Sequence, residues 1–342
     1  MFKQPAQSRF FGLLILLALL ASVAGCAQNP LGSAPRTIEP ARPADSPPTS
    51  RNPAGTVRPL AGHPLAALFD GGTRQLVVLC PEASDSTSIA VFGAAPLPPR
   101  VIGVRARATA LTGDDHGTVY LATRGGYLVV HLAGGDPQSV DVADAASTDF
   151  TAIARRADGK LELGSADGAV YTVTSGAVEH RNKIFSRVDA LATQGNTTVV
   201  LDRGQTSVTT IGADGRVEQA LRAGQGATTL AADPRGRVLV ADTRGGQLLV
   251  YGVDPLILRQ AYPVRLAPYG LAGSRDLAWI SQTASNVVIG YDLSTGIPVE
   301  KVRYPTVQQP NSLAFDEASG TLYVVSGTGA GVQVITHAGV GR

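Results

Sequence analysis

The sequence predicts an all-β fold, a seven-bladed β-propeller built from repeats of about 41 residues. Three observations carry this prediction. A small residue followed by an aliphatic one recurs seven times after residue 60. Asp-Gly and Gly-Gly dipeptides, which tolerate the positive φ angles of tight hairpins, separate short apolar runs. No segment after residue 60 has the apolar periodicity of an amphipathic helix.

The aliphatic residue of each repeat marks its position in the chain, and we call it the anchor. Successive anchors are 43, 42, 38, 39, 41 and 42 residues apart, a period typical of a four-stranded propeller blade. We expect each anchor to lie on the innermost strand of its blade. The seven anchors are Leu68, Leu111, Ile153, Leu191, Leu230, Leu271 and Leu313.

The two ends of the repeat region predict how the ring closes. Only two clear strands follow the last anchor, at residues 321–326 and 332–336, so the last blade lacks an outer strand. Residues 56–60 precede the first anchor and can supply that strand. Pro59 is tolerated there because the outermost strand has a free edge. We therefore expect a propeller over 56–342, closed by an N-terminal strand that completes the last blade.

Two repeats resemble known propeller families. Residues 230–242, which begin Leu-Ala-Ala-Asp-Pro-Arg-Gly, resemble an NHL-type repeat. Residues 310–325, which begin Pro-Asn-Ser-Leu-Ala-Phe-Asp, are similar to YVTN-type and gluconolactonase-type repeats. The resemblance implies the propeller fold. It implies little about function, because propellers carry many unrelated activities.

Residues 1–25 have the order of a secretory signal: two positive charges, an apolar run over 10–20, and then small residues. The end of this segment resembles a bacterial lipobox, formed by Val23, Ala24, Gly25 and Cys26. That resemblance implies cleavage before Cys26 and transfer of a diacylglyceryl group to its thiol. One alternative is an uncleaved membrane helix, although the run is shorter than the roughly 20 residues a bilayer needs. The other is secretion without lipid.

Residues 26–55 are expected to form the lipidated cysteine and a disordered, proline-rich tether. Eight prolines lie between residues 27 and 59, aromatic residues are absent, and apolar residues are few. Such a segment buries too little surface to offset the entropy of ordering it. The predicted location is therefore the extracytoplasmic side of the cell membrane, where the lipid anchor makes the membrane a partner.

The charge balance argues against a nucleic-acid partner. Lys3 and Arg9 belong to the predicted signal, which leaves 27 basic side chains against 27 acidic ones, with no basic stripe.

Two single residues are expected to be structural. Cys80 lies in an apolar run and predicts a buried, inert thiol. Trp279 predicts packing between blades.

The candidate ligand-binding residues stand two positions before the anchors. Propellers bind ligands at one mouth of the central channel, so we expect these side chains to ring that mouth. The six that can form hydrogen bonds are Thr109, Thr151, Asp189, Thr228, Tyr269 and Asn311; the seventh position is Ala66. In the alternative interpretation, the same groups satisfy local turns and backbone groups.

The gluconolactonase-type resemblance implies a divalent metal held by carboxylate and asparagine side chains at such positions. Asn311 matches the asparagine of that family's Pro-Asn-Gly-Leu segment, and Asp189 resembles its aspartate. No glutamate occupies this position in any repeat, whereas calcium needs six to eight oxygen ligands. We therefore expect no metal and no cofactor.

The sequence favours a non-enzymatic binding or scaffold module for a protein, a peptide or an envelope component. A rigid repeat scaffold, a long spacer and the lack of a convergent catalytic set lead to this hypothesis. The alternative is an extracytoplasmic lactonase- or lyase-like enzyme that uses the channel mouth. A third interpretation, a purely structural spacer, requires a channel without a pocket.

Overall fold

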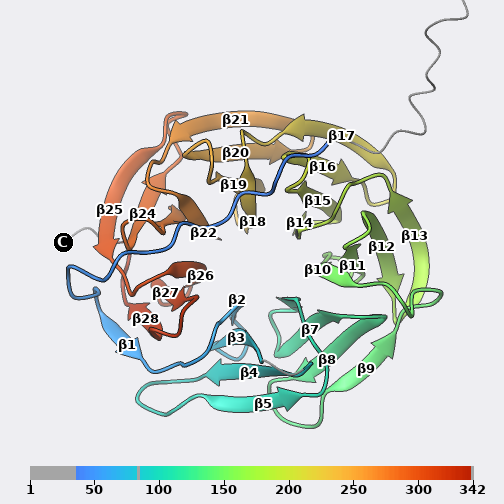
Figure 1. Ribbon diagram of the computed structural model, residues 1–342, viewed down its shortest axis with the longest axis horizontal. Coiled ribbons are helices and arrows are strands. Elements are labelled where there is room, and N and C mark those ends of the chain that lie inside the picture. Colours follow the sequence, from blue (N-terminus) through green and yellow to red (C-terminus); the bar gives the residue numbers. More distant parts are fainter. Residues whose placement is uncertain (1–35, 83–84, 340–342) are drawn as a thin grey trace, which may run out of the picture. The chain divides into compact units, whose positions relative to one another are not determined.

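Each repeat folds into one antiparallel sheet of four strands that follow one another in sequence order. The computed structural model describes residues 36–82 and 85–339, and it places seven such sheets around a central channel (Figure 1). This arrangement is the predicted seven-bladed β-propeller. The described residues contain no helix.

The strands are given blade by blade, from the channel outward. Blade 1 has β2 (Ala66–Asp70), β3 (Gln75–Pro81), β4 (Thr87–Phe92) and β5 (Arg100–Val104). Blade 2 has β6 (Ala110–Gly113), β7 (Thr118–Thr123), β8 (Gly126–His131) and β9 (Gln138–Asp141). Blade 3 has β10 (Phe150–Arg155), β11 (Leu161–Ser165), β12 (Ala169–Thr174) and β13 (Ala177–Lys183). Blade 4 has β14 (Ala190–Gln194), β15 (Thr197–Asp202), β16 (Ser207–Ile211) and β17 (Val217–Arg222).

The remaining three blades follow the same plan. Blade 5 has β18 (Ala227–Asp233), β19 (Arg237–Asp242), β20 (Gln247–Val253) and β21 (Leu256–Pro263). Blade 6 has β22 (Pro268–Gly273), β23 (Ala278–Gln282), β24 (Val287–Asp292) and β25 (Val299–Pro305). Blade 7 has β26 (Pro310–Asp316), β27 (Thr321–Ser326), β28 (Val332–Ile335) and, as its outermost strand, β1 (Thr56–Arg58). Every predicted anchor lies on the innermost strand of its blade.

The ring closes as predicted, because β1 pairs antiparallel with β28. The closing strand also contacts the first blade, since the Arg58 guanidinium lies 4.7 Å from the centre of the Phe92 ring. On the channel side, the Ser312 hydroxyl of blade 7 donates to the Leu65 carbonyl oxygen at 3.3 Å, just before blade 1 begins. The two ends of the repeat region are therefore joined at the rim and at the axis.

Apolar side chains fill the space between neighbouring blades. Trp279 is fully buried, and its ring stacks on Phe315 of the next blade with centroids 5.7 Å apart. The Cys80 thiol is buried and free of any disulfide, and burial raises its pKa to about 11. Both residues are structural, as predicted. The predicted turns also form: Gly168 follows Asp167 with a φ of 84°, where a Cβ atom would lie 1.9 Å from a backbone oxygen.

Residues 36–55 differ from the predicted disordered tether. They run as an extended segment, which we call the strap, across one face of the ring from blade 4 to blade 7 (Figure 1, blue). The Ile38 amide donates to the Gly204 carbonyl oxygen at 2.7 Å, and the Ala44 amide donates to the Thr283 hydroxyl at 3.1 Å. Ala41 is buried. The expectation of disorder is therefore wrong for this part of 26–55, because the propeller supplies partners for the strap's backbone groups.

The predicted signal over 1–25 and the lipobox residues Val23, Ala24, Gly25 and Cys26 lie outside the described residues. The same is true of residues 26–35 of the predicted tether. Within the described part of the chain, no helix has the length and apolar character needed to cross a membrane.

Candidate functional site

The innermost strands begin on the same face of the ring, which we call the mouth face, and enclose a cavity of about 310 Å³ there. The residue two positions before each anchor lines this cavity in all seven blades. All six predicted polar residues line it: Thr109, Thr151, Asp189, Thr228, Tyr269 and Asn311. The repeat register therefore brings them together. Their role in ligand binding stays a prediction.

The threonine hydroxyls of the mouth are committed to backbone groups. The Thr109 hydroxyl donates to the Phe150 carbonyl oxygen of the next blade at 2.6 Å. The Thr151 hydroxyl donates to the Val188 carbonyl oxygen at 2.5 Å, again toward the next blade. Thr228 contacts groups of its own blade. These bonds match the alternative interpretation, although each hydroxyl oxygen can still accept a hydrogen bond from a ligand.

Asp189 is the one carboxylate among the described lining residues, and its side chain is 9% exposed. The Arg187 Nε donates to its Oδ1 at 3.0 Å, and the Arg203 amide donates to its Oδ2 at 3.0 Å. Both oxygens therefore already accept a hydrogen bond. The carboxylate fixes the position of two arginines at the mouth.

Arg203 lines the cavity and was not predicted from the sequence, because it follows a second strand and does not stand two positions before an anchor. It follows β15 directly. Its guanidinium donates to the Ala41 carbonyl oxygen of the strap, while its Nε is buried without a hydrogen-bond partner among the described residues. Burial raises the pKa of the Tyr269 hydroxyl, and the Arg203 charge opposes that shift. The hydroxyl is therefore protonated at neutral pH and can donate to a ligand.

Asn311 connects the cavity to the strap. Its Oδ1 accepts a hydrogen bond from Gln309 Nε2 at 3.0 Å. The same Gln309 amide group donates to the Ala44 carbonyl oxygen at 3.0 Å and accepts from the Ser46 amide at 2.9 Å. The strap is therefore hydrogen-bonded to Arg203 in blade 4, which contacts Asp189 of the mouth. It is also hydrogen-bonded to Gln309, which contacts Asn311 in blade 7.

The described residues contain no group of three histidine, cysteine, aspartate or glutamate side chains that could hold a metal ion. The two residues that the gluconolactonase-type resemblance assigns to a metal are Asp189 and Asn311. In this structure the oxygen atoms of both side chains accept hydrogen bonds from protein groups.

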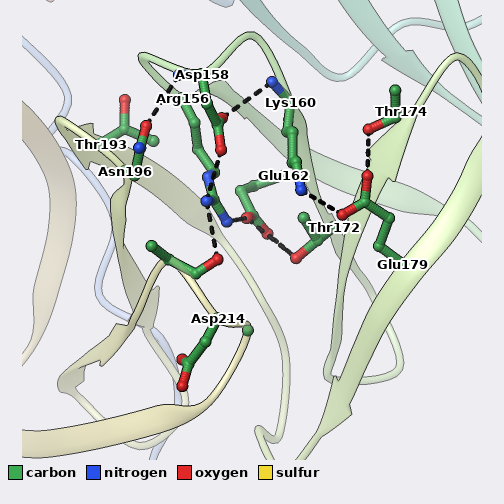
Figure 2. Close-up of polar contacts among 12 residues, drawn as sticks. Arg156, Asp158, Lys160, Glu162, Thr172, Thr174, Glu179, Thr193, Asn196 and Asp214 are labelled. Atoms are coloured by element: carbon green, nitrogen blue, oxygen red, sulfur yellow. Dashed lines mark hydrogen bonds and ion pairs between the residues drawn. The ribbon is translucent and has the colours of Figure 1, made fainter.

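Figure 2 shows a second polar cluster, centred on blade 3. Its residues do not line the mouth cavity. Arg156 Nη1 lies 3.3 Å from Glu162 Oε1, and the two side chains are 1% and 0% exposed. The Thr172 hydroxyl donates to Glu162, and Arg156 Nη2 donates to the Ala213 carbonyl oxygen of blade 4 at 3.0 Å. Burial raises the pKa of Glu162 to about 7.

This cluster was not predicted from the sequence, which gives no sign that Arg156 and Glu162 meet. Asp158 accepts a hydrogen bond from Arg156 Nη2 at 2.8 Å at the edge of the cluster. Because the Arg156 and Glu162 side chains are inaccessible to solvent, a ligand cannot reach them. Their contacts instead join blade 3 to blade 4.

No family model and no curated protein matches the chain. The NHL-type and YVTN-type resemblance therefore stays a prediction. Solved structures do match. A chain of a mitotic checkpoint complex superposes with a TM-score of 0.70 at 11% identity, covering 86% of this chain and 98% of that one.

Two enzymes show the same likeness. A streptogramin B lyase has a TM-score of 0.65 at 12% identity, covering 83% of this chain and 97% of that one. A hydrazine synthase from Kuenenia stuttgartiensis has a TM-score of 0.62 at 15% identity, covering 82% and 97%. At these identities the likeness shows the fold alone. The propeller is established, and its function must be argued from the site.

Proposed function

We propose that this chain is a lipid-anchored extracytoplasmic protein whose propeller binds a protein, a peptide or an envelope component at the mouth face. Arg203 carries this proposal. Its side chain is half-buried and lines the cavity, and Tyr269 offers a hydroxyl to the same cavity. A guanidinium and a phenol hydroxyl are both hydrogen-bond donors, so a ligand that presents carbonyl or carboxylate oxygens to this cavity can accept from them.

The anchoring part of the proposal rests on the lipobox-like residues that end in Cys26. Replacing Cys26 with serine removes the thiol that would carry the lipid. We expect the wild-type chain to sediment with the cell membrane and the Cys26→Ser chain to leave that fraction. Equal sedimentation of both chains contradicts lipid anchoring through this residue.

The binding part is tested by capture from a detergent-solubilised envelope with the full chain as bait. Arg203→Gln and Tyr269→Phe together change the donors that face the cavity and keep similar side-chain shapes. We expect a partner that the wild-type chain retains and the double variant loses. Arg216→Gln is the matched control, because this side chain is 85% exposed in the turn between β16 and β17. Equal capture by the wild type and the double variant places the binding surface elsewhere.

The enzyme alternative, a lactonase- or lyase-like activity, would use the same cavity. Asp189 is its candidate acid or base, as the one carboxylate among the described lining residues. Turnover of a lactone by the full chain, lost in Asp189→Asn, would support this alternative. Turnover that persists in the variant would contradict a role for this carboxylate.

A further inference from the structure

A second depression on the mouth face adjoins the channel cavity. Its volume is about 640 Å³, and it shares Thr109 and Thr151 with the channel cavity. Arginines from three connections around blades 1 to 4 line it, and we call it the arginine cleft. The charged residues of its lining are Arg105, Arg107, Arg124, Arg187, Asp85 and Asp149.

The arginine cleft carries positive charge that the protein does not neutralise. Arg105 and Arg107 are exposed, and neither side chain has a hydrogen bond or ion pair with any described residue. Arg124 pairs with Asp149 at 3.2 Å, but both side chains are at least 60% exposed, so water and salt screen the pair. Arg187 also lines the cleft and contacts Asp189 through Nε, so its terminal nitrogens have no hydrogen bond to a described residue.

The strap shows how this face of the propeller binds an extended chain. Arg203 and Arg244, from blades 4 and 5, donate to the carbonyl oxygens of Ala41 and Glu39. Backbone carbonyl groups of an extended segment are thus bound by arginines from the loops between the second and third strands. Recognition of main-chain groups in this way does not depend on the sequence of the segment.

The register of the blades places Arg124 where Arg203 stands. Ala190 pairs with Leu201 in blade 4, and Ala110 pairs with Ala122 in blade 2. In each blade the arginine comes two residues after the paired residue of the second strand. Arg203 holds the strap, whereas Arg124 faces the arginine cleft, which the strap does not line.

We propose that the arginine cleft binds an acidic, extended peptide segment of a partner protein. Arg124 binds a backbone carbonyl group, as its equivalent does on the strap, and Arg105 and Arg107 bind carboxylates. Guanidinium groups match carboxylates with paired, charge-assisted hydrogen bonds. This proposal rests on the proposed binding function and names the chemistry of the partner.

The two aspartates of the cleft favour a peptide over a polyphosphate. Asp85 and Asp149 repel a ligand whose every group is anionic, whereas a peptide also presents amide donors that a carboxylate accepts. Ala106 and Ala166 add small apolar surface to the lining. The mixed lining therefore suits a ligand that has both hydrogen-bond donors and acceptors and a net negative charge.

The test is fluorescence anisotropy with the full chain in detergent and a labelled peptide of alternating glutamate and glycine. We expect binding that weakens as salt is raised. The double variant Arg105→Glu and Arg107→Glu should weaken it by at least about tenfold, because like charges then face the peptide. Arg216→Glu is the matched control, since it also reverses the charge of an exposed arginine, in a turn between a third and a fourth strand. It should leave the affinity unchanged.

Three results overturn the proposal. The first is equal affinity of the wild type and the double variant for the glutamate peptide. The second is binding of polyphosphate without binding of the peptide, which would assign the cleft to phosphate groups. The third is no binding of the peptide at low salt. If an envelope partner is still captured through Arg203 and Tyr269, the proposed function stands while the cleft proposal fails.

Discussion

Arginine side chains are central to two regions of this propeller, and the two regions differ in burial and in charge pairing. Arg156 in blade 3 is 1% exposed and lies against the fully buried Glu162 (Figure 2). Arg105 and Arg107 in the arginine cleft are exposed and have no ion pair among the described residues. The first region uses a guanidinium to join two blades, and the second leaves guanidinium groups available to a ligand.

Arg203 lies between these two cases. It is half-buried, its amide is fixed by Asp189, and its guanidinium binds the strap. The strap therefore occupies an arginine that would otherwise face solvent. In this propeller, an arginine therefore becomes structural where another part of the chain covers it and remains available to a ligand where nothing does.

The largest expected effect is on the buried pair. Glu162→Ala leaves the Arg156 charge buried with only Asp158 nearby, so we expect the free energy of unfolding to fall by about 3–5 kcal/mol. Chemical denaturation of the full chain measures this loss. A loss below about 1 kcal/mol would place Arg156 among the arginines that do not stabilise the fold.

The same pair should give the protein a specific pH dependence. Burial raises the pKa of Glu162 to about 7 in the folded chain, against an ordinary value of about 4.5. The folded state then binds more protons than the unfolded state between these values, so this group's contribution to stability is full below about 4.5 and is lost as pH rises through about 7. Relative to Glu162→Gln, the wild type should therefore gain about 1–3 kcal/mol between pH 7.5 and pH 5. Parallel stability curves for the two chains over this range would contradict the raised pKa.

A smaller effect is expected on the strap. Gln309→Ala removes the amide that bonds Ala44 and Ser46, so we expect a loss of about 1–2 kcal/mol and faster hydrogen exchange at the Ser46 amide. Hydrogen-exchange mass spectrometry on the strap measures the second effect. Gln138→Ala, on the exposed strand β9, is the control and should change neither quantity. Unchanged exchange in Gln309→Ala would show that other contacts suffice to order the strap.

The fold was predictable because its pattern repeats within the sequence. Seven anchors at regular spacing define seven blades, and a missing outer strand after Leu313 indicates closure by residues 56–60. The same register placed Thr109, Thr151 and Asp189 at one mouth. The register did not predict the hydrogen-bond partner of each threonine hydroxyl. That partner depends on the distance to the neighbouring blade, and the sequence of a single repeat does not encode this distance.

The strap and the Arg156 cluster were not predictable for a different reason. Composition describes what a segment can bury by itself, and residues 26–55 can bury little. The donors that order residues 36–55 come from far along the chain: Ala44 and Gln309 are 265 positions apart. Arg156 likewise becomes buried only when blade 4 brings the Ala213 carbonyl oxygen against it.

The smallest change in stability is expected for the exposed arginines of the cleft. Arg105→Ala removes a side chain with no partner among the described residues, so we expect the free energy of unfolding to change by no more than about 0.5 kcal/mol. Denaturation of this variant beside Glu162→Ala tests both arginine regions in one experiment. A loss above about 1 kcal/mol in Arg105→Ala would mean that the arginine cleft stabilises the fold, and its residues would no longer be free for a partner. No change in stability, together with weaker binding of the glutamate peptide, would separate the two uses of arginine: in blade 3 it holds the propeller together, and in the cleft it selects what the propeller binds.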